Sequence, residues 1–351
     1  MLVCTSWRKT IIETPRFWTR FELPYHRPLH LARNLRRAQD APLDVAVRIR
    51  SDVPVDIESV KRFLTNNIHR VERLIVIAYG VNLTDMIADT AAPLLRRLLI
   101  RAGKRQGIVT SHLDFALSSP YLEEMSLIGC VVQPPLNVFR NVRRLHLMSA
   151  SFQRKFGGWS TDSVFQVLSH CRQTVEELEL DTVDIDGEQA YESMTILTLS
   201  KLRRLSWRTT AARLNLLEFI SAPALQTLHT FNYSEMPMDG SRFIPSSLTQ
   251  LPAKMPVVLE VYYLSTEHKL GLNFYADLSR KEKLFASTYT FLRHGWDYIE
   301  FFQAFLKEQG LPSVKHVRYS ADDPGVLSSM RSVVYSIPSV KHSQVWDLHD
   351  G

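Results

Sequence analysis

A short phrase of the form apolar-x-x-apolar-x-apolar recurs along this chain of 351 residues and restricts its fold more than any other feature. Clear copies start at the following residues: Val71, Leu95, Leu122, Val142, Val175, Leu202 and, in weaker form, Leu225. Degenerate copies start at Val258 and Val314. The alternating apolar positions that end the phrase are typical of a half-buried strand. Apart from the interval of 33 residues after Val142, successive clear copies start 20 to 27 residues apart, which is a period typical of structural repeats.

The segments around the copies carry their own periodicity. Apolar residues at helical spacing predict helices within 57–68, 113–117, 164–168 and 214–220, and alternation over 43–49 predicts another strand. Thr161 or Asp162 would cap the third helix. The long interval contains a polar and aromatic stretch from Ser151 to Asp162, which we interpret as a loop insertion.

This pattern resembles the leucine-rich-repeat family, and the resemblance covers most of residues 43–233. It implies an α/β solenoid, with a parallel sheet on the concave side and helices on the convex side. We expect the solenoid to occupy residues 43–351 and to be irregular after residue 234. Its core should include the following residues: Val71, Leu95, Leu98, Leu145, Leu178, Leu180 and Leu205.

Charged pairs fill the variable positions of the phrase. In chain order they are Glu72-Arg73, Arg96-Arg97, Glu123-Glu124, Arg143-Arg144, Glu176-Glu177 and Arg203-Arg204. From the second copy onward the sign alternates, so neighbouring parallel strands would place opposite charges side by side. We interpret these pairs as a self-complementary ladder that fixes the strand register, in preference to a charged stripe that binds a ligand.

Other positions on the concave strands lie outside the pairs of this ladder and are candidates for binding a protein target. They are Arg101, His146, Met148, Arg208, His229 and Phe231. Arginine, methionine and aromatic residues are enriched at protein interfaces. Ordinary exposure to solvent is the alternative interpretation.

The first residues predict a compact helical segment. Val3, Trp7 and Ile11 recur at helical spacing over residues 1–13, and Pro15 suits the first position of a second short helix capped by Thr14. Aromatic residues are dense here, which predicts a compact cluster of Trp7, Phe17, Trp18 and Phe21.

Residues 1–23 resemble the second half of an F-box, with a Val-Cys pair, a Trp-Arg pair, a proline and a tryptophan in the family's order. The resemblance implies docking to the Skp adaptor of a cullin–RING ubiquitin ligase through Leu2, Val3, Cys4, Trp7, Arg8, Pro15 and Trp18. A full F-box begins with a Leu-Pro helix upstream of the position of Met1, so the matched part is N-terminally truncated. Residues 24–42 would form a connecting helix and linker, and residues 29–49 are similar to the segment that follows the F-box in a large fungal set of such proteins. Two alternatives are a helical cap on the solenoid and an interaction scaffold without a ligase role.

The C-terminal third has a weaker pattern. Four prolines within residues 234–256 predict a loop or a change of register. Residues 296–306 have the spacing of an amphipathic helix, a strand is expected near Phe285, and Val333 to Ile337 is the candidate closing strand. A separate small domain is the alternative.

Composition limits the function classes. The net charge of +6 is spread along the chain, which does not favour nucleic-acid binding, and the three cysteines are far apart, which argues against a disulfide framework or a zinc site. No apolar run is long enough for a membrane span, no secretory signal is evident, and no familiar catalytic motif occurs. We therefore expect a cytoplasmic or nuclear protein that is not an enzyme, needs no cofactor and binds other proteins.

Overall fold

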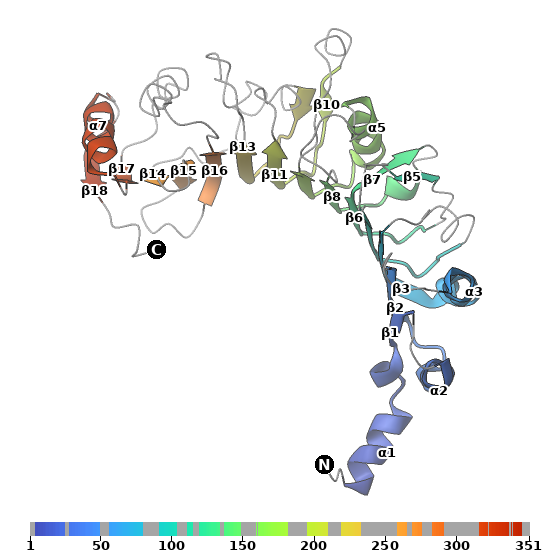
Figure 1. The fold of residues 1–351 in the computed structure, drawn as a ribbon. Coiled ribbons are helices and arrows are strands. Elements are labelled where there is room, and N and C mark those ends of the chain that lie inside the picture. Colours follow the sequence, from blue (N-terminus) through green and yellow to red (C-terminus); the bar gives the residue numbers. More distant parts are fainter. Residues whose placement is uncertain are drawn as a thin grey trace. The chain divides into compact units, whose positions relative to one another are not determined.

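The computed structural model describes residues 4–24, 28–49, 56–79, 91–103, 111–114, 119–133, 137–148, 159, 161–181, 195–209, 219–232, 258–264, 269–275, 283–290, 316–321, 323–336, 338 and 340–345. The chain forms two compact units, Met1–Val175 and Glu176–Gly351. Each unit is mixed α/β and contains a sheet in which parallel pairs predominate (Figure 1). No helix in the described ranges is long and apolar enough to cross a membrane.

The first unit combines short helices with parallel strands. Its helices are α1 (Thr5–Glu13), η1 (Pro15–Trp18), α2 (Pro28–Ala38), α3 (Ile57–Asn67), η2 (Ile68–Arg70), η3 (Asn137–Phe139) and α5 (Thr161–Cys171). Its main sheet runs in the order β1 (Arg20–Leu23), β2 (Leu43–Ile49), β3 (Val71–Tyr79), β4 (Arg97–Gly103), β6 (Glu124–Ile128) and β8 (Arg144–Met148). All neighbouring pairs in this order are parallel. Strands β5 (Ser111–Asp114) and β7 (Cys130–Gln133) form a separate parallel pair.

The two faces of this sheet differ because apolar and polar residues alternate along each strand. In β2, Val45 and Val47 are fully buried, whereas Asp44 and Arg48 remain accessible. Helices α2, α3 and α5 lie on the buried side of the strands (Figure 1). There, Phe63 of α3 packs against Phe21 of β1 with ring centroids 5.8 Å apart. The apolar positions of the phrase therefore form the core.

The predicted core residues are confirmed in both units. All of them are at most 2% exposed: Val71, Leu95, Leu98, Leu145, Leu178, Leu180 and Leu205. The predicted strand over 43–49 and the predicted helix within 57–68 are also confirmed, as β2 and α3.

The N-terminal segment is helical, but its aromatic residues do not cluster. Trp7 and Phe17 are 63% and 61% exposed, while Phe21 lies in β1 and packs against the sheet's core instead. Thr14 lies at the N-cap position of η1 without capping it, because its hydroxyl donates a hydrogen bond to the Thr10 carbonyl. The predicted aromatic cluster is therefore wrong.

The second unit contains a sheet with one reversed segment. Its strands run in the order β9 (Glu177–Asp181), β11 (Arg204–Thr209), β13 (Thr227–Asn232), β16 (Lys283–Thr290), β15 (Lys269–Tyr275), β14 (Val258–Leu264), β17 (His316–Ala321) and β18 (His342–Val345). The pairs of β15 with β14 and with β16 are antiparallel, and the other pairs are parallel. Strands β10 (Leu197–Thr198) and β12 (Ile220–Ser221) pair separately. The strand expected near Phe285 is confirmed as part of β16.

Several predicted helices and strands differ from the structure. Residues 111–114 form strand β5 instead of the start of a helix, and Ile220 begins strand β12. Conversely, residues 333–335 belong to helix α7 (Pro324–Tyr335), and the closing strand is β18. The prediction of an amphipathic helix over 296–306 lies outside the described residues.

The helix predicted within 164–168 is confirmed as α5, but its start differs from the prediction. Thr161 is the first residue of α5 and Asp162 lies in its first turn, so neither is the cap, and both belong to the helix instead of the proposed loop insertion. Trp159 is buried, and residues 151–158 of the insertion lie outside the described ranges.

Candidate functional site

The accessible face of the main sheet in the first unit, which we call the open face, carries side chains in three rows. The charged row consists of Arg20, Asp44, Arg73, Arg97, Glu124 and Arg144. The middle row consists of Glu22, Ala46, Ile75, Leu99, Ser126 and His146. The outer row consists of Arg48, Ile77, Arg101, Ile128 and Met148. Because the strands are parallel and in register, each row crosses the sheet at right angles to the strands.

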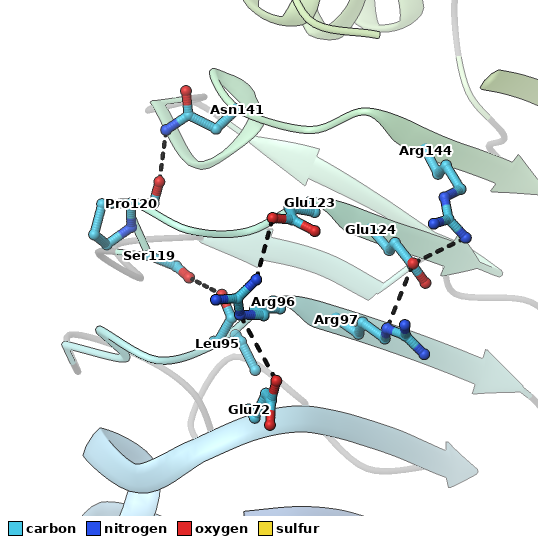
Figure 2. A network of polar contacts seen from close by, with 10 residues as sticks. All are labelled: Glu72, Leu95, Arg96, Arg97, Ser119, Pro120, Glu123, Glu124, Asn141 and Arg144. Atoms are coloured by element: carbon cyan, nitrogen blue, oxygen red, sulfur yellow. Dashed lines mark hydrogen bonds and ion pairs between the residues drawn. The ribbon is translucent and has the colours of Figure 1, made fainter. Parts of the chain in front are cut away.

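Ion pairs between neighbouring strands hold the charged row. Glu124 contacts Arg97 on one side, with 3.4 Å between Oε1 and Nε, and Arg144 on the other, with 2.9 Å between Oε1 and Nη1 (Figure 2). At the other end of the row, Asp44 lies 3.5 Å from Arg20 and 3.6 Å from Arg73. Each carboxylate thus bridges two arginines, as the interpretation of a self-complementary ladder expects.

A second ladder consists of the first residue of each charged pair, one position before the charged row. Arg96 contacts Glu72 at 3.7 Å and Glu123 at 3.4 Å (Figure 2). The Ser119 hydroxyl also donates a hydrogen bond of 3.0 Å to the carbonyl of Leu95, the residue before Arg96 (Figure 2). These contacts connect successive repeats at their strand starts. In the second unit, Arg204 and Glu177 are register partners 3.5 Å apart, like the pairs of the charged row in the first unit.

The charged row contains one break in its alternation of sign. Arg73 of β3 and Arg97 of β4 are register partners, so two arginines stand next to each other on adjacent strands. Both side chains remain accessible, at 43% and 57%. The carboxylates that they contact lie on the outer sides of the pair. This is where the open face places like charges together.

The middle and outer rows contain apolar side chains that keep partial contact with solvent. Ile75, Ile77, Leu99, Ile128 and Met148 are all half-buried. Because β3 is apolar on both faces, it contributes two of them. Ile75 and Ile77 were missed as candidates, although the unbroken apolar run from Leu74 to Ala78 in the sequence signals a strand with two apolar faces.

Three of the predicted target-binding residues meet on this face. Arg101 and Met148 share the outer row on either side of Ile128, and His146 lies in the middle row. Arg101 is exposed, while His146 and Met148 are half-buried. His146 Nδ1 lies 3.2 Å from the Ser126 hydroxyl, which orients the imidazole ring along the row.

The other three predicted target-binding residues lie in the second unit. Arg208 and Phe231 are register partners on β11 and β13, and His229 is half-buried and opposite Ser206. Arg208 contacts Asp181 at 3.2 Å, and the Asp181 side chain is only 8% exposed. Arg208 thus lies outside the pairs of the ladder, as expected, but it forms an ion pair of its own with a carboxylate on the neighbouring strand. The Phe231 side chain lies outside the described part of the structure.

The predicted adaptor-binding residues separate into two groups. Cys4, Trp7 and Arg8 are exposed at the start of α1, a helix with no buried residue. Pro15 and Trp18 are half-buried. The Trp18 indole N–H donates a hydrogen bond of 2.8 Å to the Ile11 carbonyl, and the Arg37 guanidinium lies 4.4 Å above the ring. Leu2 and Val3 lie outside the described residues.

Two of the described cysteines, Cys130 and Cys171, are buried. Burial raises the pKa of the Cys130 and Cys171 thiols to about 12, which keeps them protonated at neutral pH. Across the described ranges, no group of three or more His, Cys, Asp or Glu side chains could hold a metal ion.

Comparisons with known proteins give no assignment. The chain matches no family model, no curated protein and no solved structure. Function must therefore be argued from the residues and their geometry.

Proposed function

We propose that the chain is a leucine-rich-repeat solenoid that captures a protein target, and that it acts as the substrate receptor of a cullin–RING ubiquitin ligase. The open face would bind the target and α1 would dock the Skp adaptor. In this proposal the chain does no chemistry itself, since other subunits of the ligase transfer ubiquitin. The observation that carries the target-binding role is the open face, where half-buried apolar side chains of the middle and outer rows lie beside the charged row.

The solenoid proposal is supported by the regular recurrence of parallel strands. The strand from each clear copy pairs in register within its unit, and the same apolar positions are buried each time. In such a fold each repeat contacts only the repeats next to it, so the stacking of repeats stabilises the fold. A face held this way presents side chains at fixed spacing, which suits the recognition of another protein.

The adaptor-docking proposal is supported by the exposure of α1. Trp7 is 63% exposed, and the neighbouring positions Cys4 and Arg8 are exposed too. A large exposed aromatic residue next to an arginine is a composition that protein interfaces favour. Trp18 contacts both helices, through its hydrogen bond to Ile11 of α1 and its stacking with Arg37 of α2, and so holds α1 in position relative to α2.

The half-buried positions of Pro15 and Trp18 favour the second candidate function, a scaffold without a ligase role. Those two residues serve the internal packing of the N-terminal segment, as in a helical cap that covers the end of the sheet. In that case α1 would bind no adaptor, while the open face would still bind its target.

Co-purification of the full chain with the Skp adaptor separates the two candidates. The ligase role predicts binding that is lost in Trp7→Ala/Arg8→Ala and kept in Lys9→Ala, a control on the same exposed helix. Far-ultraviolet circular dichroism should be unchanged in all variants, because α1 buries none of these side chains. A second version of the protein carries an F-box Leu-Pro helix fused ahead of Met1. Absence of adaptor binding in both versions would overturn the ligase role and leave the scaffold.

A further inference from the structure

We propose that the open face recognises an acidic segment of its target, with a carboxylate of the target inserted between Arg73 and Arg97. This inference rests on the proposed target-binding role of the open face and is independent of adaptor docking. It names the chemistry of the partner, which is an extended peptide segment with an acidic residue and an apolar residue close to it.

The first support is the order of charges along the charged row. It reads Arg20, Asp44, Arg73, then Arg97, Glu124, Arg144, so each half is an arginine–carboxylate–arginine triplet. Adjacent strands lie about 4.8 Å apart, which brings Arg73 and Arg97 close enough to repel each other. One further carboxylate between them would make the alternation continuous across the whole sheet.

The second support is the direction in which the bound carboxylates lie. Arg73 contacts Asp44 at 3.6 Å, and Arg97 contacts Glu124 at 3.4 Å, each on the side away from the other arginine. A guanidinium group has five N–H donors, more than one carboxylate oxygen can accept. Two arginines on adjacent strands can therefore hold an additional carboxylate from both sides.

The third support is the charge of the open face as a whole. Its arginines are Arg20, Arg48, Arg73, Arg97, Arg101 and Arg144, and its carboxylates are Glu22, Asp44 and Glu124. Arg48 pairs with Glu22 at 2.9 Å. The excess positive charge therefore lies at Arg73 and Arg97, in the middle of the charged row, and at Arg101 in the outer row. An acidic partner is complementary to that excess.

The neighbouring rows favour a peptide over a nucleic acid. Ile75 and Leu99, which lie two residues after Arg73 and Arg97, are half-buried and apolar, and Ile77 follows in the outer row. The phosphate backbone of a nucleic acid would cover these side chains but offer them no apolar group to contact. In an extended peptide, by contrast, side chains on one side recur at every second residue, so an acidic residue can be followed by an apolar one at the required spacing.

A screen with the full chain tests this inference without any identified target. Immobilised protein selects from a displayed library of random peptides, and the selected peptides are synthesised for affinity measurements. We expect enrichment of Asp or Glu with an apolar residue two positions away. Affinity should fall by about tenfold or more in Arg73→Gln/Arg97→Gln, and it should fall as salt is raised.

Matched controls separate a loss of contact from a loss of fold. Arg62→Gln/Arg172→Gln removes two exposed arginines from outside the open face and should leave affinity unchanged. Arg73→Lys/Arg97→Lys keeps the charge but loses the planar fork of donors, so it should bind with intermediate affinity. Thermal melting of each variant confirms that the first unit remains folded.

Three outcomes would overturn the acidic-segment inference. They are selected peptides without acidic residues, acidic peptides whose affinity ignores the Arg73/Arg97 substitutions, and a screen that yields no ligand. Binding of a DNA duplex through these arginines, in place of peptides, would identify a nucleic acid as the partner and also overturn it. Failure of adaptor binding would leave it intact, because the screen contains no adaptor.

Discussion

Arg208 on β11 holds a largely buried carboxylate, since its Nη1 atom lies 3.2 Å from Oδ2 of Asp181 on β9. The Asp181 side chain is 8% exposed, so the loss of its partner leaves a charge with little access to water. We expect Arg208→Ala to lower the free energy of unfolding by about 1–2 kcal/mol, because a buried charged group without its partner is costly. Urea denaturation measures this, and Arg101→Ala is the exposed control, with a change below about 0.5 kcal/mol. Equal stability of wild type and Arg208→Ala would contradict the role assigned to the pair.

Leu178 lies in the core of the second unit, where it is 2% exposed. Replacement by alanine removes buried methyl groups and leaves a cavity, which should cost about 2–5 kcal/mol of stability. Met148 in the first unit is half-buried on the open face, so Met148→Ala should chiefly weaken target binding. Denaturant unfolding and affinity for a selected ligand distinguish the two effects. A stable Leu178→Ala protein would contradict the core position of the phrase's leucines.

Glu124 bridges Arg97 and Arg144, and its side chain is 25% exposed. Glu124→Gln removes both ion pairs and should lower the free energy of unfolding by about 0.5–1 kcal/mol. Glu124→Lys should lower it further, because four cations would then stand side by side, from Arg73 to Arg144. The difference between the two variants should shrink in high salt, which screens partly exposed charges. Salt-independent unfolding midpoints would show that the row does not act electrostatically.

Cys130 and Cys171 should be inert to alkylation in the folded protein. Burial raises the pKa of both thiols to about 12, and alkylating reagents react with the thiolate. Cys4 is exposed, so iodoacetamide should label it in the native state and label the other two only after denaturation. Peptide mass spectrometry after timed labelling reads the result. Rapid native labelling of Cys171 would place α5 differently from the structure.

His316 and His342 stack on adjacent strands of the second unit, with ring centroids 4.9 Å apart. Burial, followed by repulsion from His342 and Arg318, lowers the pKa of His316 below the usual value of 6.5. The folded state therefore binds fewer protons than the unfolded state just below that pH, so stability should fall as the pH drops through about 6.5. His342→Gln should reduce this pH dependence in urea titrations. A larger dependence in that variant would exclude repulsion between the two rings.

The strands of the repeat could be predicted because each one buries alternate residues of the same phrase. Leu178 and Leu180 illustrate this, since their spacing of two identifies both the strand and its buried face. Position within the phrase also placed Arg101, His146 and Met148 on one accessible face. What it could not give was the identity of side-chain partners, such as the contact of Arg208 with a buried Asp181.

The mistakes in the C-terminal third arose where a short segment fits two periods. Val333 and Tyr335 fit an alternating pattern, yet Tyr335 is 65% exposed, while Met330, Val333 and Val334 are buried at helical spacing. The start signal of that helix was present in the sequence. Asp323 precedes Pro324, and its side chain accepts hydrogen bonds from two backbone N–H groups of the first turn.

Strands β14, β15 and β16 form an antiparallel meander, in which β15 is the reversed strand. This meander has a consequence for how the second unit folds. These three strands pair with their neighbours along the chain, so their contacts close short loops. By contrast, the pairing of β13 with β16 joins residues far apart in sequence, such as Leu228 and Phe285. Contacts between nearby residues form faster than distant ones. The meander can therefore form early. Its two edge strands are then free to pair later with the parallel strands, β16 with β13 and β14 with β17.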